Sequence, residues 1–172
     1  MQDLGNWAEI MARCLYMTGL RKTDVVQNMA GYGLFTGGLG WHQASERIGA
    51  TVVPMSSGNT RRQIMLIQDF ETTVFCCTPS YAIYVAEQAE EMGVDLRQST
   101  LRVGIHGAEP WSENMRREIA RRLGLDPIDT YGLSELVGPG VSGECTEHCG
   151  LHLMEDHFLC EVVKPETDFF KV

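Results

Sequence analysis

Two short segments of the chain carry residues whose chemistry suits a nucleotide. In the first, Gly107 and Ala108 have little or no side chain, so their backbone can approach a flat group. In the second, Tyr131 offers a ring for stacking and Ser134 a hydroxyl for a phosphate. Glu135 adds a hard oxygen for Mg²⁺, which usually binds one or two carboxylates together with phosphate oxygens. These residues predict a nucleotide site with a metal-bridged phosphate; the alternative is that both segments are polar turns that cap a sheet.

Two further residues lie beside these segments. Asp129, two positions before Tyr131, carries an acceptor for an exocyclic amine. His106 precedes the first segment, and a lone histidine is more often packed or hydrogen-bonded than a general base. We therefore expect His106 to be structural.

A separate cluster has the chemistry of a zinc site. Cysteines and histidines gather within sixteen residues, namely Cys145, His148, Cys149, His152, His157 and Cys160. Zinc prefers four nitrogen or sulfur ligands in a tetrahedron, and Cys145, Cys149 and His152 would supply three of them. Cys76 or Cys77 is a candidate for the fourth. The alternative is a set of buried thiols and solvated histidines.

The elements that must position these residues alternate between helix and strand. The apolar spacing predicts helices over 3–17, 44–48, 60–70, 80–92 and 112–123, with Ser80 and Ser112 as N-caps and strands over 24–29, 50–54, 73–77, 101–105 and 128–131. This order predicts an α/β fold, a layered and mostly parallel sheet with helices on both faces. Ligands of such sheets bind beyond the carboxyl ends of the strands, which selects the loops after Cys77, Ile105 and Thr130. The arginines of the last helix are expected to form a solvated face, namely Arg116, Arg117, Arg121 and Arg122.

The pattern changes after about Gly138. Apolar residues alternate there, which favours antiparallel strands: Leu151, Leu153, Phe158 and Val162. We therefore expect an α/β core over residues 1–137 and the beginning of a small antiparallel β subdomain over 138–172.

Composition excludes several classes of protein. The 172 residues carry a formal net charge of −9, which disfavours general binding to nucleic acid. No run of 18 apolar residues is present, so we expect no transmembrane helix. The first residues have neither a basic start nor an apolar core, so no signal peptide is expected. These features predict a cytoplasmic protein whose cysteines form no disulfide framework.

The order of several blocks resembles the phenylacetate–CoA ligases of the adenylate-forming superfamily. The blocks span residues 107–111, 129–135 and 138–140, supported by 32–40, 46–52, 78–81 and 155–158. The resemblance extends from about Asp3 to Thr167. It implies the central part of the N-terminal domain of such an enzyme and a role in breaking down aromatic compounds.

The resemblance implies a two-step reaction that uses ATP, Mg²⁺, CoA and an arylacetate. The carboxylate attacks the α-phosphorus of ATP, and the thiol of CoA then displaces AMP. The implied nucleotide contacts are Gly107, Ala108, Glu109, Pro110, Asp129, Tyr131 and Gly132. Ser134 would contact phosphate and Glu135 would hold Mg²⁺ as catalytic residues. The acyl group would meet Ala30, Phe35 and Gly107, and the small Ala30 leaves room for a bulkier arylacetate.

The chain also departs from the pattern of the superfamily. The phosphate loop with its lysine and the C-terminal domain with the adenylation lysine do not appear in it, and Ser56–Thr60 is expected to be only a turn and helix cap. We therefore expect a fragment with little or no turnover on its own, from an enzyme that is a homodimer at full length. Two alternatives stay open: a ligase for another arylacetate such as indoleacetate, and a non-catalytic module that binds a nucleotide or zinc.

Overall fold

The computed structural model describes residues 2–33 and 35–163. Its α-helices are α1 (Gln2–Met17), α2 (Thr36–Ile48), α3 (Thr60–Asp69), α4 (Pro79–Glu91) and α5 (Glu113–Leu123). Its strands are β1 (Val25–Asn28), β2 (Thr51–Val53), β3 (Val74–Cys77), β4 (Val103–Gly107), β5 (Asp126–Leu133), β6 (Gly138–Glu144) and β7 (Leu151–Leu153). Two short 3-10 helices are η1 (Leu96–Gln98) and η2 (Ser134–Leu136).

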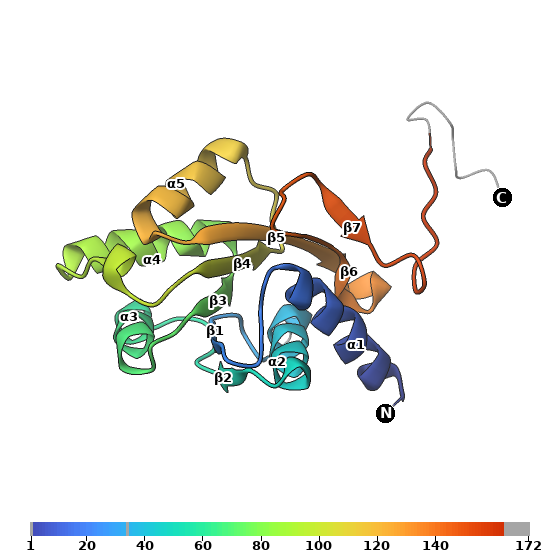
Figure 1. Ribbon diagram of the computed structural model, residues 1–172, viewed down its shortest axis with the longest axis horizontal. Helices are drawn as coiled ribbons and strands as arrows, with labels where there is room; N and C mark the ends of the chain where they lie inside the picture. Colours follow the sequence, from blue (N-terminus) through green and yellow to red (C-terminus); the bar gives the residue numbers. More distant parts are fainter. Residues whose placement is uncertain (1, 34, 164–172) are drawn as a thin grey trace.

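All strands belong to one seven-stranded sheet in the order β2-β1-β3-β4-β5-β6-β7 (Figure 1). The pairs from β2 to β5 are parallel, while β6 and β7 add antiparallel strands at one side. The predicted α/β class and mostly parallel sheet are therefore confirmed. The sheet changes from parallel to antiparallel at β5, which pairs in parallel with β4 and antiparallel with β6.

Helices cover both faces of the sheet (Figure 1). In β3, alternate residues enter two different cores: Val74 packs with residues of α1 and α2, whereas Phe75 packs with residues of α3, α4 and α5. Because side chains alternate across a strand, a strand buried on both faces is mostly apolar. This explains the continuous apolar run of β3, whereas β1 ends in Gln27 and Asn28, which are polar and fully buried.

Helix boundaries follow local capping chemistry. The Ser112 hydroxyl accepts a hydrogen bond from the Met115 amide at 3.3 Å, and Gly124 ends α5 in the left-handed conformation at φ 70°, as predicted. The predicted cap at Ser80 is wrong. Thr78 caps α4 instead, because Pro79 is favourable at the first helical position, where no amide hydrogen is needed.

Helix α2 begins at Thr36, eight residues before the predicted start. Its glycines disfavour a helix in isolation but allow close packing in this fold. A Cβ at Gly38 would lie 2.3 Å from the Gly31 carbonyl oxygen, and one at Gly40 would lie 2.7 Å from the Trp7 ring. Tertiary packing therefore outweighs intrinsic propensity in this segment.

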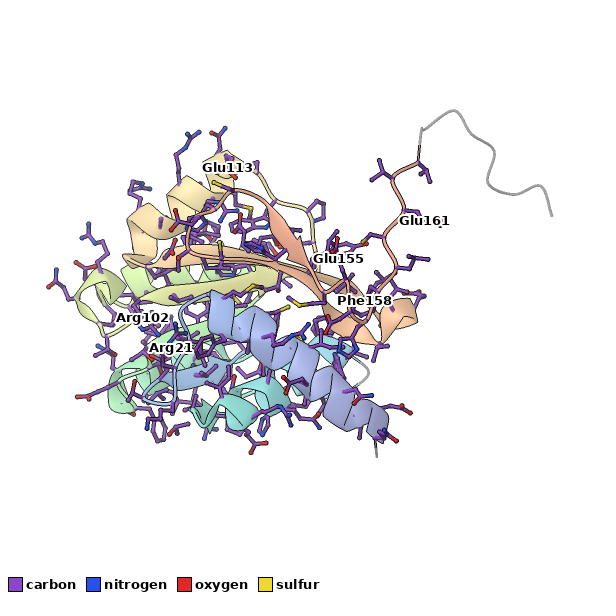
Figure 2. The ribbon with its side chains drawn as sticks, turned by 45° about the vertical axis from the view of Figure 1, so that its right-hand side comes forward. Arg21, Arg102, Glu113, Glu155, Phe158 and Glu161 are labelled. Atoms are coloured by element: carbon purple, nitrogen blue, oxygen red, sulfur yellow. The ribbon has the colours of Figure 1, made fainter. Side chains whose placement is uncertain are left out.

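The region after Gly138 contains antiparallel strands, but these continue the main sheet. The division into 1–137 and 138–172 stays a prediction. Phe158 lies outside any strand and packs with Met154 against Ile10 and Cys14 of α1 (Figure 2). Through Val163, the described residues after the turn at 155–157 form no further strand.

Candidate functional site

Strands β4 and β5 bring the two predicted segments to the same edge of the sheet. Gly107 pairs with Thr130 in the parallel register, and the Thr130 hydroxyl donates to the His106 carbonyl at 2.9 Å. A Cβ on Gly107 would lie 2.4 Å from the Thr130 carbonyl oxygen. Only glycine therefore allows the two strand ends to approach this closely.

A cavity of about 460 Å³ opens beyond this edge, and we call it the Tyr131 cavity. It is lined by Ala108, Glu109, Pro110, Trp111, Asp129, Thr130, Tyr131, Gly132 and Leu151. Six of the predicted nucleotide residues therefore line one hollow. Trp111 and Leu151, which were not predicted from the sequence, complete its apolar walls.

A second cavity of about 290 Å³ adjoins the first, and we call it the Ser134 cavity. It is lined by Phe35, Thr36, Gly37, Trp41, Gly107, Ala108, Thr130, Gly132, Leu133, Ser134, Glu135 and Pro139. Both cavities share Ala108, Thr130 and Gly132 as a common wall. The predicted aryl, phosphate and metal residues thus meet beside the predicted nucleotide residues.

Ala30 is not brought to the Ser134 cavity. It is buried in the core between the sheet and the first two helices, and its amide donates to the Asn28 side-chain oxygen at 3.1 Å. Phe35 is 40% exposed and lines the cavity over Gly37, where a Cβ would lie 2.5 Å from the Phe35 ring. Of the three predicted acyl contacts, Phe35 and Gly107 therefore line the cavity, whereas Ala30 does not.

Ser134 and Glu135 lie on η2, in the short connection between β5 and β6. Both residues are exposed, and the Ser134 hydroxyl lies 3.5 Å from that of Thr36. The pairing of β5 with β6 shifts in register between Tyr131 and Gly132, just before this connection. The two polar side chains are therefore free to meet a ligand at the mouth of the Ser134 cavity.

Glu109 joins the third predicted loop to the site. Its carboxylate accepts a hydrogen bond at 2.6 Å from the amide of Ser80, in the first turn of α4. A negative charge is favourable at a helix N-terminus, where amide hydrogens lack helical partners. The loop after Cys77 therefore braces the segment that carries Gly107 and Ala108.

Asp129 is half-buried in the wall of the Tyr131 cavity. Burial raises the pKa of its carboxyl group, and a hydrogen bond from Trp111 opposes the rise. The nearby Glu144 carboxylate also raises this pKa, whereas Arg116 lowers it. Asp129 thus presents an acceptor that is only partly hydrated, which suits recognition of an amine.

His106 is a packed residue, as expected. Its ring is fully buried and lies edge-on to Phe75 and Trp111, and its Nδ1 lies 3.2 Å from the Cys77 carbonyl oxygen. Within the described part of the chain, Nε2 has no hydrogen-bond partner. Burial lowers the pKa of the imidazole to about 4, so the ring is neutral at pH 7.

Ala108 adopts the left-handed conformation at φ 71°, which is strained for any residue with a Cβ. We expect Ala108→Gly to increase the free energy of unfolding by up to about 1 kcal/mol, as measured by urea denaturation. Ala120→Gly, inside α5, is the matched control and should lower it by about 1 kcal/mol. Equal destabilisation by both substitutions would show that the strain at residue 108 is absent.

The predicted zinc ligands are not gathered. Across residues 2–33 and 35–163, no three Cys, His, Asp or Glu side chains are arranged to hold a metal ion. Cys149 and His152 are exposed, and Cys149 Sγ lies 3.2 Å from the Glu147 carbonyl oxygen. His148 pairs with Asp126 at 2.9 Å instead. These residues are close in sequence, but their side chains do not converge on one point.

The chain matches known proteins over nearly its whole length. Phenylacetate-coenzyme A ligases from Aromatoleum evansii, Thermus thermophilus and Escherichia coli are 49%, 51% and 50% identical over 97%, 96% and 95% of this chain. These matches cover only 38%, 37% and 38% of the relatives, so the chain spans less than two-fifths of their length. The predicted resemblance to this group of ligases is confirmed.

Solved structures agree on the fold. An open conformation of 2-hydroxyisobutyryl-CoA ligase superposes with a TM-score of 0.82 at 24% identity, over 88% of this chain and 35% of that one. A long-chain-fatty-acid-CoA ligase from Archaeoglobus fulgidus gives a TM-score of 0.68 at 16% identity, over 85% and 30%. Among the described residues, no helix is long and apolar enough to cross a membrane.

A family model described as AMP-binding enzyme matches residues 6–158. This range includes β4, β5 and η2, and hence both cavities and the side chains that line them. The chain therefore belongs to the family of AMP-binding enzymes.

Proposed function

We propose that the chain forms the adenylate-binding part of an arylacetate–CoA ligase, with phenylacetate as the acyl substrate. In this reaction the arylacetate carboxylate attacks the α-phosphorus of ATP and expels pyrophosphate. The thiol of CoA then attacks the acyl carbon and releases AMP. The support from sequence is about 50% identity to relatives named phenylacetate-coenzyme A ligase.

The wall that the two cavities share carries the proposal. On one side of this wall, the Tyr131 cavity holds the Tyr131 ring and the Asp129 acceptor. On the other side, the Ser134 cavity holds the Ser134 hydroxyl and the Glu135 carboxylate. An acyl-adenylate has the same division, because its purine and its acyl phosphate lie at opposite ends of one ribose. Holding both ends at fixed positions lowers the entropic cost of bringing the reacting groups together.

Each side chain then has a role that follows from its place. The ring of Tyr131 stacks on adenine, and Asp129 accepts from the exocyclic amine. Ser134 donates to a phosphate oxygen at the mouth of the second cavity. Phe35 packs against the aryl group, because an exposed aromatic ring gains by covering another apolar surface.

Glu135 is the residue that would hold Mg²⁺. Its exposed carboxylate lines the Ser134 cavity next to the Ser134 hydroxyl, and Mg²⁺ commonly uses one or two carboxylates with substrate phosphates and water. When bound, the ion neutralises charge on the phosphates. We extend the proposal to a cytoplasmic enzyme of aromatic breakdown that uses CoA and is a homodimer at full length.

Isothermal titration with ATP tests the proposal on this chain. We expect Glu135→Gln to weaken the binding of ATP in the presence of Mg²⁺ by roughly tenfold, because the amide is a poor ligand for a hard cation. With EDTA in place of Mg²⁺, the wild-type chain and the variant should bind ATP equally.

Glu91→Gln is the matched control, since Glu91 ends α4 and lies outside the residues that line either cavity. It should bind as the wild-type chain does in both buffers. A wild-type chain that binds no adenine nucleotide would overturn the proposed function, and equal binding by Glu135→Gln with Mg²⁺ would remove the role of Glu135.

A further inference from the structure

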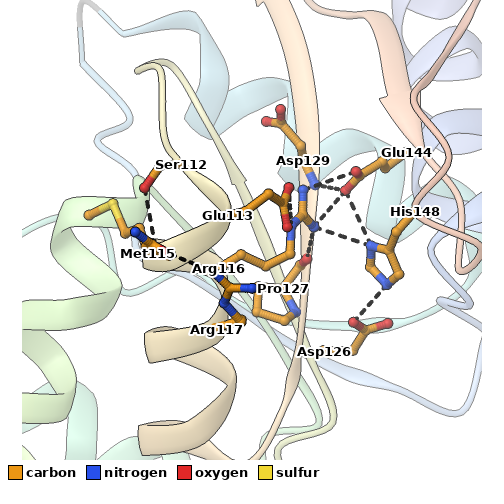
Figure 3. Close-up of polar contacts among 11 residues, drawn as sticks. Ser112, Glu113, Met115, Arg116, Arg117, Asp126, Pro127, Asp129, Glu144 and His148 are labelled. Atoms are coloured by element: carbon orange, nitrogen blue, oxygen red, sulfur yellow. Dashed lines mark hydrogen bonds and ion pairs between the residues drawn. The ribbon is translucent and has the colours of Figure 1, made fainter.

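A buried ion pair joins α5 to β6 beside Asp129, which lines the Tyr131 cavity (Figure 3). The Arg116 guanidinium on α5 forks onto the Glu144 carboxylate on β6, with NH1–Oε2 at 2.8 Å and NH2–Oε1 at 2.9 Å. The two side chains are only 15% and 7% exposed. The expectation that the arginines of this helix form a solvated face is therefore wrong for Arg116. Exposed Arg117 fits it, whereas Arg122 is also largely buried.

Both members of the pair contact residues that line the cavity. Glu144 Oε2 accepts a hydrogen bond at 2.9 Å from the backbone amide of Asp129 (Figure 3). The Arg116 guanidinium lies over the Trp111 ring, 4.5 Å from its centroid. Trp111 in turn lowers the pKa of the Asp129 carboxyl group through its side chain. The ion pair thus contacts Trp111, an aromatic wall of the cavity, and the backbone of Asp129, whose carboxylate is the acceptor.

Further contacts to β5 and to His148 hold the ion pair in place. Arg116 NH1 also donates to the Pro127 carbonyl of β5. His148 pairs with Asp126 at 2.9 Å, and its Nδ1 lies 3.5 Å from Glu144 Oε2. The side chains of Arg116 and Glu144 are therefore constrained, because each contacts residues outside its own helix or strand. A buried pair of this kind holds geometry well, since loss of one partner leaves a charge without compensation.

We propose that Arg116 and Glu144 are positioning residues for the purine: they hold Trp111 against one side of the Tyr131 cavity and fix the Asp129 carboxylate at the position where it selects an exocyclic amine. This inference rests on the proposed function. It assigns the selectivity for adenine over other purines to residues that do not themselves line the cavity. The planar fork of arginine is essential, because it binds the carboxylate with two nitrogens while its face stacks on the ring.

Arg116→Lys tests the proposal, and Arg117→Lys is its matched control. Lysine keeps the positive charge beside Glu144 but has neither the fork nor the flat face. Arg117 neighbours Arg116 on α5 and is exposed. We expect Arg116→Lys to lower the ratio of ATP affinity to GTP affinity by roughly tenfold, whereas Arg117→Lys leaves the ratio unchanged.

The ratio separates positioning from general damage to the fold. A merely structural role for Arg116 would weaken the binding of both nucleotides and leave the ratio as it is, which would overturn the proposal. A second readout needs no nucleotide. Trp111 is the partly exposed tryptophan, while Trp7 and Trp41 are buried, so quenching by acrylamide reports on residue 111. We expect Arg116→Lys to increase this quenching.

The remaining outcomes are also decisive. If Arg116→Lys does not fold, Glu144→Gln replaces it, because the amide keeps an acceptor for Asp129 but weakens the fork. A wild-type chain that binds ATP and GTP equally would overturn the inference and leave the proposed nucleotide site standing. A chain that binds neither would overturn the proposed function. Unchanged quenching of Trp111 in Arg116→Lys, or in Glu144→Gln where that variant replaces it, would overturn the positioning of that ring.

Discussion

Gly107→Ala is expected to lower the free energy of unfolding by roughly 3 kcal/mol and to abolish ATP binding at the concentrations where the wild-type chain is saturated. The added Cβ would lie 2.4 Å from the carbonyl oxygen of Thr130 and 2.9 Å from its hydroxyl. The carbonyl is backbone and cannot rotate away, so β4 and β5 would have to separate at their ends. Urea denaturation followed by circular dichroism measures the first effect and calorimetric titration the second.

Gly5→Ala provides the contrast for this substitution. Gly5 lies on the exposed part of α1, and no atom lies within 4 Å of an added Cβ. Alanine should therefore stabilise the chain by about 0.5–1 kcal/mol through its better helix propensity. If Gly107→Ala were as harmless as Gly5→Ala, the close approach of the two strand ends would be refuted.

His106→Phe is expected to make the chain resistant to acid. Burial holds the pKa of His106 at about 4 in the folded chain, against 6.5 for an exposed histidine. Between these values the unfolded chain takes up a proton that the folded chain refuses, so stability is present above pH 6.5 and falls toward pH 4. Over this range the wild-type chain should lose up to roughly 3 kcal/mol relative to the phenylalanine variant.

The measurement is the difference in unfolding free energy between variant and wild type at pH 7 and at pH 4. Phenylalanine keeps an aromatic edge against Phe75 and Trp111 and removes the unpaired Nε2. His152→Phe is the control, since His152 is exposed on β7. A difference that stays constant with pH for His106→Phe would mean that the ring is not held neutral by burial.

The parallel part of the fold could be predicted because its signals are local. Strand β3 is a continuous apolar run, and helix ends such as Ser112 and Gly124 carry capping residues that act within a few positions. The proposed site rests on topology, since Gly107 ends β4 and Tyr131 lies in the neighbouring β5. Once the sheet is parallel, these ends must lie at one edge.

The parts that were missed depend on distant contacts. Helix α2 forms in spite of its glycines because Trp7 and the Gly31 backbone lie against it. Arg116 looks like a surface arginine until Glu144, 28 residues away, is placed beside it. The zinc prediction failed for the same reason, because closeness along the chain does not decide where side chains point. None of these outcomes follows from spacing alone.

The packing of α1 has a consequence for how the chain is made. The Trp7 indole donates to the Pro139 carbonyl at 2.8 Å, and a Cβ on Gly140 would lie 2.7 Å from the sulfur of Met11. The packing of α1 is therefore completed by a strand that is synthesised 132 residues later. At ordinary rates of translation this delay is on the order of ten seconds. During that time part of the apolar face of α1 lacks its final partner, which makes the nascent chain a natural client for a chaperone.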